Sequence, residues 1–370
     1  MLPTVSEEAV SADTVTADPS QGVATVVDAP EGEDETPVVV GDVTVSIAAT
    51  TPVGVQAALG SLYNDVLHFN LKAGSDGASV TGFTLKKTGL VANTHITGVS
   101  VWDDAGVRHG AIATALDDNG QVTIGFGNNP INIAANGTET VSVKVNVLST
   151  ATATNFQMGV VAVESAAAVA GLPVYGNQSS IVSGTLASYT ITTSSVSGYS
   201  AESTAQSSSN EGQLEIGDVQ KEAGKWTFAE SGNEDLEIEE ITFYIQGTVN
   251  EESDLKNWTL YGPANEVLGT TEFATDRYVT VPVNYTLLKG YSKTLTLKVD
   301  VVEGSNKYFA VSIQNDYDTM AKGLSTGYFV APNVTTFPSA GYIPGNAWFK
   351  MKQGTLSVQK DTLSPSSNVP

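Results

Sequence analysis

Apolar and polar residues alternate strictly in two segments that are near-copies of each other, 140–147 (TVSVKVNV) and 294–301 (TLTLKVDV). In both, every second residue is Val or Leu, and the residues between them are polar. Period-two alternation is typical of a β-strand that buries one face. The second segment follows the first by 154 residues (141 to 295), which indicates a repeated β-domain.

Other strand-like segments recur around this pair in the same order. They are 68–73 with 226–230, 80–85 with 238–243, 96–102 with 255–261, and 156–163 with 308–313. Turns rich in Asp, Asn and Gly separate them, at the spacing of a sandwich or barrel. The pattern predicts an all-β chain of two tandem antiparallel immunoglobulin-like sandwiches. A jelly roll is the competing fold.

The predicted organisation has four parts. An acidic tether covers 1–40, the first sandwich 41–183, the second 184–353, and a terminal strand 354–370. Each sandwich starts with a similar strand at Gly41 or Gly184, and a third such strand starts at Gly354. In it Leu356 and Val358 alternate with polar residues. We expect this strand either to open a further module or to be donated to another chain; pairing within the second sandwich is the alternative.

The composition of the chain limits the classes of binding partner and the chemistry it could perform. The chain has 40 acidic against 17 basic residues and a formal charge of −23, which disfavours nucleic acid and anionic membranes. No apolar run is long enough for a membrane-spanning helix. Cysteine is absent, so thiol catalysis and thiolate metal sites are excluded. An acidic, cysteine-free β-protein is typical of a secreted bacterial or archaeal surface protein, and a cytosolic protein is the alternative.

The sequence contains no recognisable catalytic motif. The three histidines, His68, His95 and His109, lie in separate segments and lack the spacing of a metal site. No Gly-x-Ser-x-Gly elbow precedes a helix. We therefore expect no enzymatic activity and no catalytic or cofactor-binding residue. Aromatic residues such as Trp226, Trp258 and Tyr261 could stack on a sugar, but packing explains them better.

Calcium is the ligand that fits the sequence best, because Asp, Asn and loop carbonyls supply the oxygens it prefers. The first candidate loop contains Asp117 and Asn119, and the second contains Asp316 and Asp318. A bare turn is the simpler interpretation of the first loop. Neither loop has the twelve-residue pattern of an EF-hand.

The segments His68–Asp76, Val80–Leu85, Ile96–Val101 and Asn136–Val143 resemble the tandem β-sandwich modules of bacterial surface-layer and repetitive cell-surface proteins. The resemblance is closest over 43–193 and looser from 184 onward. It is carried by strand patterns, so it transfers no catalytic residue. It implies an extracellular structural role.

Three functions follow as expectations. The first is a surface-layer-like subunit that assembles with copies of itself through edge strands, which are templates for pairing with other chains. The second is a filament or pilus subunit that polymerises by donor-strand complementation. The third is an adhesin or carbohydrate-binding module with cell-envelope glycan as its partner.

Overall fold

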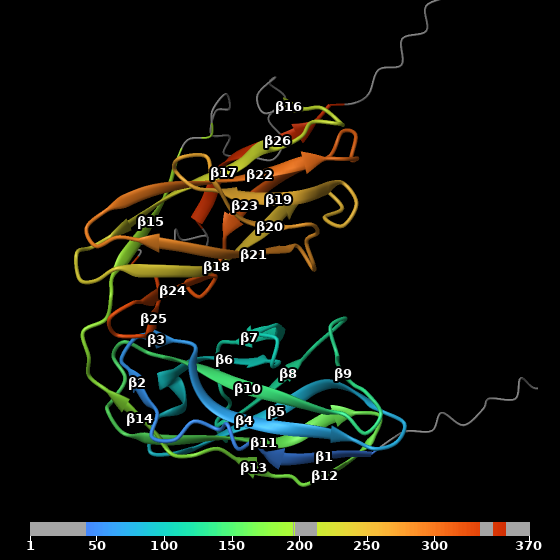
Figure 1. Cartoon of the computed structure of the whole chain (residues 1–370), viewed down its shortest axis with the longest axis vertical. Coiled ribbons are helices and arrows are strands. Elements are labelled where there is room, and N and C mark those ends of the chain that lie inside the picture. The colour runs from blue at the N-terminus through green and yellow to red at the C-terminus, as the bar shows by residue number, and fades with distance from the viewer. Residues whose placement is uncertain (1–41, 195, 197–212, 334–342, 353–370) are drawn as a thin grey trace, which may run out of the picture. The chain divides into compact units, whose positions relative to one another are not determined.

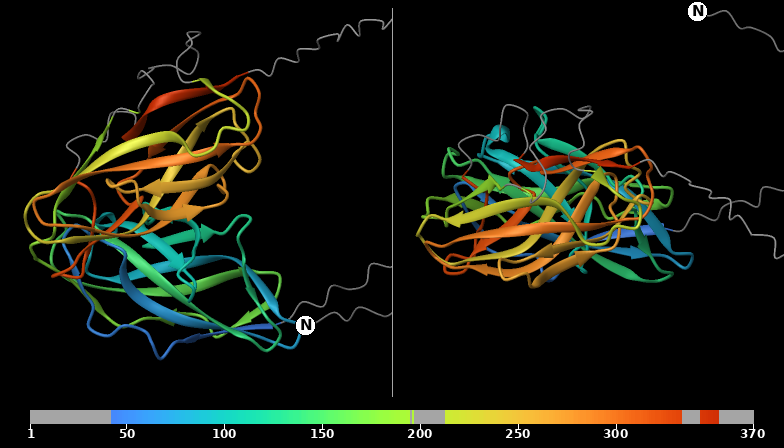
Figure 2. Two further views of the ribbon diagram at one scale, coloured as in Figure 1. Left: turned by 45° about the horizontal axis from the view of Figure 1, so that its top comes forward. Right: turned by 90° about the horizontal axis from the view of Figure 1, so that it is seen from above.

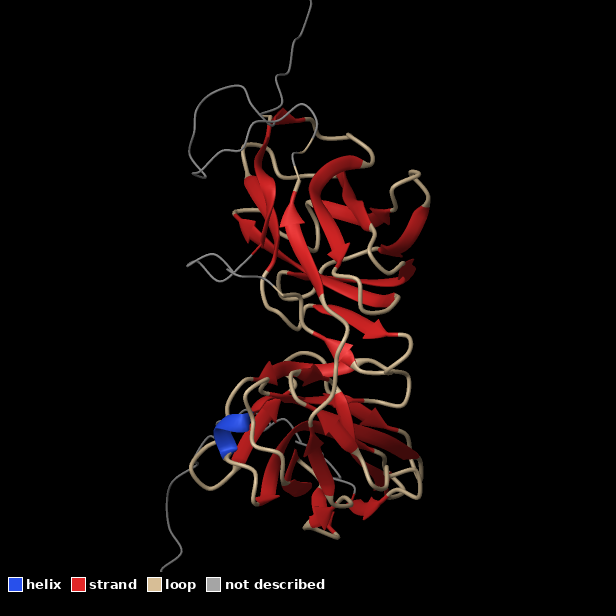
Figure 3. Ribbon diagram, turned by 90° about the vertical axis from the view of Figure 1, so that its left-hand side faces the viewer, coloured by secondary structure: helices blue, strands red, loops and turns tan. Residues whose placement is uncertain are grey.

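The computed structural model describes residues 42–194, 196, 213–333 and 343–352. Strands joined by loops and turns make up this part of the chain, together with one short 3-10 helix, Asn93–His95 (Figure 3). The predicted all-β fold is therefore confirmed. Within the same residues, no helix has the length and apolar character needed to cross a membrane. The predicted tether 1–40 and the terminal strand with Leu356 and Val358 lie outside the described residues.

The first sandwich consists of two sheets, coloured blue to green in Figures 1 and 2. One sheet has the order β12-β1-β4-β10-β6-β7, with strands Ala168–Ala170, Asp42–Ile47, Asn64–Ala73, Thr138–Val147, Ile96–Trp102 and Arg108–Ala113. The other has the order β2-β14-β11-β5-β8, with strands Gln56–Ala58, Ser179–Val182, Asn155–Ser165, Ala78–Gly89 and Gln121–Gly125. Two short strands lie off this path: β9 (Ile131–Ile133) pairs with β5, and β13 (Val174–Tyr175) with β11.

The second sandwich, coloured yellow to red, repeats this plan. One sheet has the order β15-β17-β22-β19-β20, with strands Tyr189–Thr193, Lys221–Glu230, Ser292–Val301, Leu255–Tyr261 and Val267–Thr271. The other has the order β16-β26-β23-β18-β24-β25-β3, with strands Gln213–Leu214, Ile343–Met351, Tyr308–Ile313, Leu236–Gly247, Thr319–Gly323, Phe329–Val330 and Ser61–Leu62. In addition, β21 (Tyr278–Leu287) pairs with β18.

Strand order and register both confirm the repeat. The order β1-β4-β10-β6-β7 has its counterpart in β15-β17-β22-β19-β20. One register shift recurs at the same place in both copies. Between β4 and β10 it lies next to the pair Asp65–Lys144, and between β17 and β22 it lies next to the equivalent pair Glu222–Lys298. The four strands β1-β4-β10-β6 opposite β14-β11-β5 follow the A-B-E-D and C-F-G arrangement of immunoglobulin domains. The strand β8 differs from this arrangement, because it joins the second sheet beside β5 although it follows β6 and β7 of the first sheet in the sequence.

Each sandwich has its own hydrophobic core, as the alternation predicts. Val141, Val143 and Val145 of β10 are fully buried, and so are their counterparts on β22. Each such side chain contributes roughly 1.5–3 kcal/mol by leaving water. The largest fully buried side chains of the second core are Trp226 and Trp258, which confirms packing rather than sugar stacking for these two.

The two copies differ at one long strand. In the first, β11 pairs with β5 continuously from Phe156 to Ser165 apart from two register shifts. In the second, the corresponding strand is divided into β23 and β24 by the loop 314–318, and both parts pair with β18. After β24 the chain forms β25, which pairs with β3 from the first half of the sequence (Figure 1). The loop and β25 together create a junction between the two sandwiches.

Candidate functional site

The first predicted calcium loop is organised as a turn. The Asp117 Oδ1 atom accepts hydrogen bonds from the backbone N–H groups of Asn119, at 2.9 Å, and Gln121, at 2.7 Å. Gly120 closes the turn with a φ of 72°, a conformation that glycine adopts without strain. The side chain of Asn93 donates to the carbonyl of Asp117 at 2.8 Å. Turn chemistry thus accounts for the arrangement of these residues.

The second predicted loop places its two carboxylates in different environments. Asp318 is 4% exposed, and its Oδ2 atom accepts hydrogen bonds from the backbone of Gln314, at 3.1 Å, and of Asn315, at 2.7 Å. Asp316 is exposed. Among the described residues, no group of three or more His, Asp or Glu side chains is placed to hold a metal ion. Calcium binding by Asp117 and Asn119, or by Asp316 and Asp318, stays a prediction.

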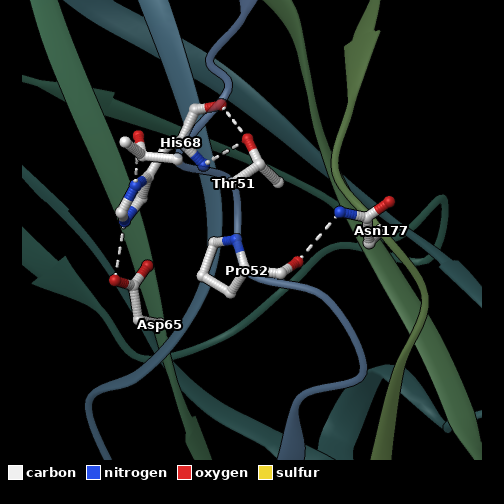
Figure 4. A network of polar contacts seen from close by, with 6 residues as sticks. Thr51, Pro52, Asp65, His68 and Asn177 are labelled. Atoms are coloured by element: carbon white, nitrogen blue, oxygen red, sulfur yellow. Dashed lines mark hydrogen bonds and ion pairs between the residues drawn. The ribbon is translucent and has the colours of Figure 1, made fainter.

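The histidines act as hydrogen-bonding groups at separate places. Figure 4 shows His68, whose Nε2 atom lies 2.7 Å from Asp65 Oδ2 while its backbone contacts Thr51. In the same view Asn177 donates to the carbonyl of Pro52 at 2.9 Å, so the network pins the loop after β1 to its neighbours. His109 is buried on the edge strand β7, with Nε2 3.2 Å from Asp103 Oδ2.

The junction is built around Tyr63, which lies directly before β4. Its ring is 4% exposed and meets Trp102 and Phe329 edge-on, with both centroid distances at 5.8 Å. Its hydroxyl donates a hydrogen bond to the carbonyl of Tyr317 in the inserted loop. Leu62, Ile112 and Met320 complete a cluster that is separate from both sandwich cores. The β3–β25 pairing, Leu62 opposite Phe329, borders it.

A side chain that accepts a hydrogen bond from the backbone N–H, called here the backbone cap, fixes the conformation of Tyr63. Its φ is 51°, in the left-handed region that side chains other than glycine rarely adopt. Asn146 Oδ1 accepts a hydrogen bond from the Tyr63 backbone N–H at 2.8 Å. Because Asn146 is itself 3% exposed, this acceptor is fixed in place by packing. Opposite it is Gly98, where a Cβ atom would lie 2.4 Å from Asn146 Nδ2.

Opposite charges meet at the junction. Among the described side chains, no ion pair within 4 Å involves Lys144 or Arg108, and Glu239 pairs with Lys322 of its own sandwich at 3.4 Å. The first sandwich contributes Lys144, 4.4 Å from the centre of the Trp102 ring, and Arg108, 6.0 Å from it. Burial lowers the pKa of Lys144, and the neighbouring carboxylates of Asp65, Glu239 and Glu240 oppose that change. Burial raises the pKa of Glu240, and here Arg108 and Lys144 oppose it.

Burial also raises the pKa of Asp318, to about 6, against hydrogen bonds from Asn315 and the field of Arg108. Cations of one sandwich therefore face carboxylates of the other. This complementarity fixes the register of an interface more than its strength. The arrangement can hold two domains together.

Sequence reasoning did not single out Tyr63, Asn146 or the inserted loop as an interface. The strand register pairs Trp102 with Ser142 and Tyr261 with Thr296. Tyr261 is therefore the counterpart of Trp102, as the match of 96–102 with 255–261 predicts, and Trp258 belongs to the core.

Comparison with known proteins gives no family. No family model matches the chain, and no curated protein matches it. Solved structures to which it has similarity include the C-terminal domain of the Streptococcus agalactiae AgI/II polypeptide BspA, at 8% identity and a TM-score of 0.20, covering 76% of this chain and 96% of that one.

The C-terminal domain of the Streptococcus pyogenes antigen I/II-family protein AspA matches at 8% identity and a TM-score of 0.19, covering 85% of this chain and 100% of that one. The serine-rich repeat protein Srr2 from Streptococcus agalactiae matches at 11% identity and a TM-score of 0.20, covering 80% and 95%. Similarity this low carries no argument about function. The fold assignment rests on the strand order of the chain itself.

Proposed function

We propose that the chain is an extracellular structural protein, a surface-layer-like subunit that assembles with copies of itself on a bacterial or archaeal cell. The observation that carries the proposal is the junction, where a strand of the first sandwich extends a sheet of the second over a buried aromatic cluster. Two sandwiches joined in this way resist bending between domains. A structural subunit needs that property, whereas enzymes rely on a reactive site.

The composition supports the same proposal. A formal charge of −23 favours solubility in a crowded extracellular layer, and the absence of cysteine removes any dependence on redox conditions. The described aromatic residues support it as well. Trp226 and Trp258 are fully buried and Trp102 is 3% exposed, so these three rings are unavailable to stack on a glycan. The adhesin alternative therefore lacks the platform it needs at these positions.

The strand inventory favours a subunit with complete domains over donor-strand polymerisation. Polymerisation of that kind needs a sandwich with a strand missing and a groove open. In the described part of the chain, the five strands of the sheet that starts with β1 and those of the sheet that starts with β15 correspond one to one. Only the short outer strand β12 has no described counterpart beside β15.

Two experiments test the proposal. Negative-stain electron microscopy of the full chain, with calcium and with a chelator, should show ordered sheets or fibres, and the calcium dependence tests the metal prediction separately. Labelling intact host cells with a membrane-impermeant amine reagent should modify surface lysines such as Lys72 and Lys289, which are exposed. A monomer under every condition, or a chain protected from the reagent, would contradict the proposal.

A further inference from the structure

The second sandwich carries a counterpart of the junction surface. Lys144 pairs in register with Asp65, and Lys298 pairs with Glu222 at the equivalent place. Counting from these pairs, Gln220 occupies the position of Tyr63 directly before its strand. The two residues share a left-handed backbone, with φ of 50° and 51°. Asp300 takes the place of Asn146, since its Oδ1 atom accepts from the Gln220 backbone N–H at 2.7 Å.

The aromatic and cationic parts of the surface recur too. Tyr261 is the counterpart of Trp102, and Lys298 lies 4.2 Å from the centre of its ring, as Lys144 does at 4.4 Å from Trp102. The edge strand supplies the next position: Arg108 pairs with Trp102, and Val267 pairs with Tyr261. The left-handed backbone, the side chain that caps it, the aromatic ring and the lysine above the ring thus correspond in the two copies.

The difference is coverage. Leu62 is 6% exposed because it pairs with Phe329 of β25 and packs in the junction cluster, but its counterpart Val219 is 66% exposed. Val267 is 57% exposed and Ile216, three residues before Val219, is 48% exposed. Polar groups surround these side chains, including the ion pair of Lys221 with Asp218 at 3.2 Å and Lys298 with Asn265 at 3.2 Å. An apolar centre with a charged rim of both signs is the usual composition of a protein interface.

We propose that this surface, defined by Val219, Tyr261 and Val267, docks a second copy of the chain; the inference rests on the proposed function and names the face that the assembly uses. In the first copy, the equivalent surface is covered by a sandwich of the same kind. The last strand of the first copy is β14, which pairs with β2, and the next strand in the sequence, β15, belongs to the covering sandwich. The chain leaves the second copy at the equivalent point, where the Lys352 N–H donates to the carbonyl of Leu214 at 2.8 Å. A sandwich of a second copy is the occupant of the same kind as the sandwich that covers the equivalent surface in the first copy.

The second copy uses a surface other than its own Met320 and Phe329. Those residues are already covered within the chain, where Met320 is 7% exposed. The docking copy therefore contacts Val219, Tyr261 and Val267 through a face other than its own junction cluster.

Sedimentation velocity over a concentration series tests the proposal with a double variant, Val219→Lys with Val267→Lys. The matched control is Val53→Lys with Leu90→Lys, two positions of the first sandwich that are 83% and 84% exposed. Wild type and control should show a mass that rises above 38.5 kDa with concentration. The surface variant should need at least a tenfold higher concentration for the same rise. Circular dichroism and thermal melting verify that all variants fold.

Two results would overturn the proposal. One is a wild-type mass that stays at 38.5 kDa up to millimolar concentration. The other is association that the surface variant weakens no more than the control does. If ordered assemblies form and the surface variant leaves them unchanged, the docking surface is wrong and the structural function stands. If the chain is protected from surface labelling, the structural function fails whatever the sedimentation result.

Discussion

Tyr63 and Gln220 occupy the same place in two copies of one fold, yet Tyr63 is at the centre of a junction and Gln220 is half-buried at an uncovered surface. Both have a left-handed backbone, and both donate a backbone hydrogen bond to a side chain of the neighbouring strand. Tyr63 places a ring against Phe329, whereas the Gln220 side chain turns back to Asp300 Oδ1, at 3.0 Å. The left-handed backbone and its hydrogen bond are therefore properties of the repeat. Whether the surface packs against another sandwich depends on the side chain at this position, Tyr63 or Gln220.

The largest effect is expected when the junction residue is exchanged for its counterpart, Tyr63→Gln. Removing a buried ring with two aromatic neighbours should lower the free energy of unfolding by about 2–4 kcal/mol. Calorimetry should then show two transitions where wild type shows one, because the sandwiches no longer stabilise each other. Tyr291→Gln is the control, since that tyrosine is 56% exposed and its loss should cost less than about 0.5 kcal/mol. Equal losses in the two variants would contradict the role of the junction.

The carboxyl group of Asp318 should give the junction side of the molecule a pH dependence. Its pKa is raised to about 6 in the folded chain, against roughly 3.9 when unfolded. The folded state then binds more protons between these values, so this contribution is present below pH 4 and is lost as pH rises through 6. The total is roughly 3 kcal/mol.

Urea denaturation of wild type and Asp318→Asn at pH 4, 5, 6 and 7 measures this contribution as a difference. Relative to the variant, wild type should lose stability across the series, and most of the change should fall between pH 4 and 6. Arg108→Val, which installs the residue found at the counterpart position 267, should steepen the loss, because the guanidinium opposes the raised pKa. A difference that is constant with pH would show that the pKa of Asp318 is not raised.

Removing the backbone caps Asn146 and Asp300 should lower the free energy of unfolding in both copies, by less than the changes above. Asn146→Ala leaves the N–H of Tyr63 without its acceptor in a buried place, which should cost about 1–3 kcal/mol. Asp300→Ala should cost less, because Gln220 is closer to water, and Asp300→Asn should retain most of the stability by keeping an acceptor. Chemical denaturation of the three variants checks the order. A larger loss from Asp300→Ala than from Asn146→Ala would reverse the comparison.

The repeated fold could be predicted from the sequence because alternation records which face of a strand is buried. Leu295 and Leu297 are buried as their spacing requires, and turns rich in Asp and Gly mark where strands end. The junction could not be predicted in that way. Tyr63 precedes its strand, its partner Asn146 is 83 residues away, and Tyr317 is 254 residues away.

The loop that holds Asp318 shows a second limit of sequence reasoning. Paired Asp residues suggested oxygen ligands for calcium, but alternation cannot tell an inward carboxylate from an outward one in an irregular loop. Asp318 points inward because it closes the loop onto its own backbone N–H groups. The insertion was not visible in the spacing of the matched segments, because the last matched pair (156 to 308, an offset of 152) begins before the loop 314–318.

The smallest expected effect concerns the two lysines above aromatic rings, where only solvent access differs. Lys144 lies over a ring that the second sandwich covers, and Lys298 lies over Tyr261 at a similar distance. A cation–π contact is worth about 2 kcal/mol when desolvated and about 0.5–1 kcal/mol when exposed. Double-mutant cycles with Lys→Met and aromatic→Leu substitutions in urea should therefore give a larger coupling for Lys144 with Trp102. Adding Tyr63→Gln should reduce that coupling toward the value of the second pair, because it opens the junction to water. If the two couplings are equal in the wild-type background, burial at the junction does not strengthen the contact, and the difference between the surfaces lies in packing alone.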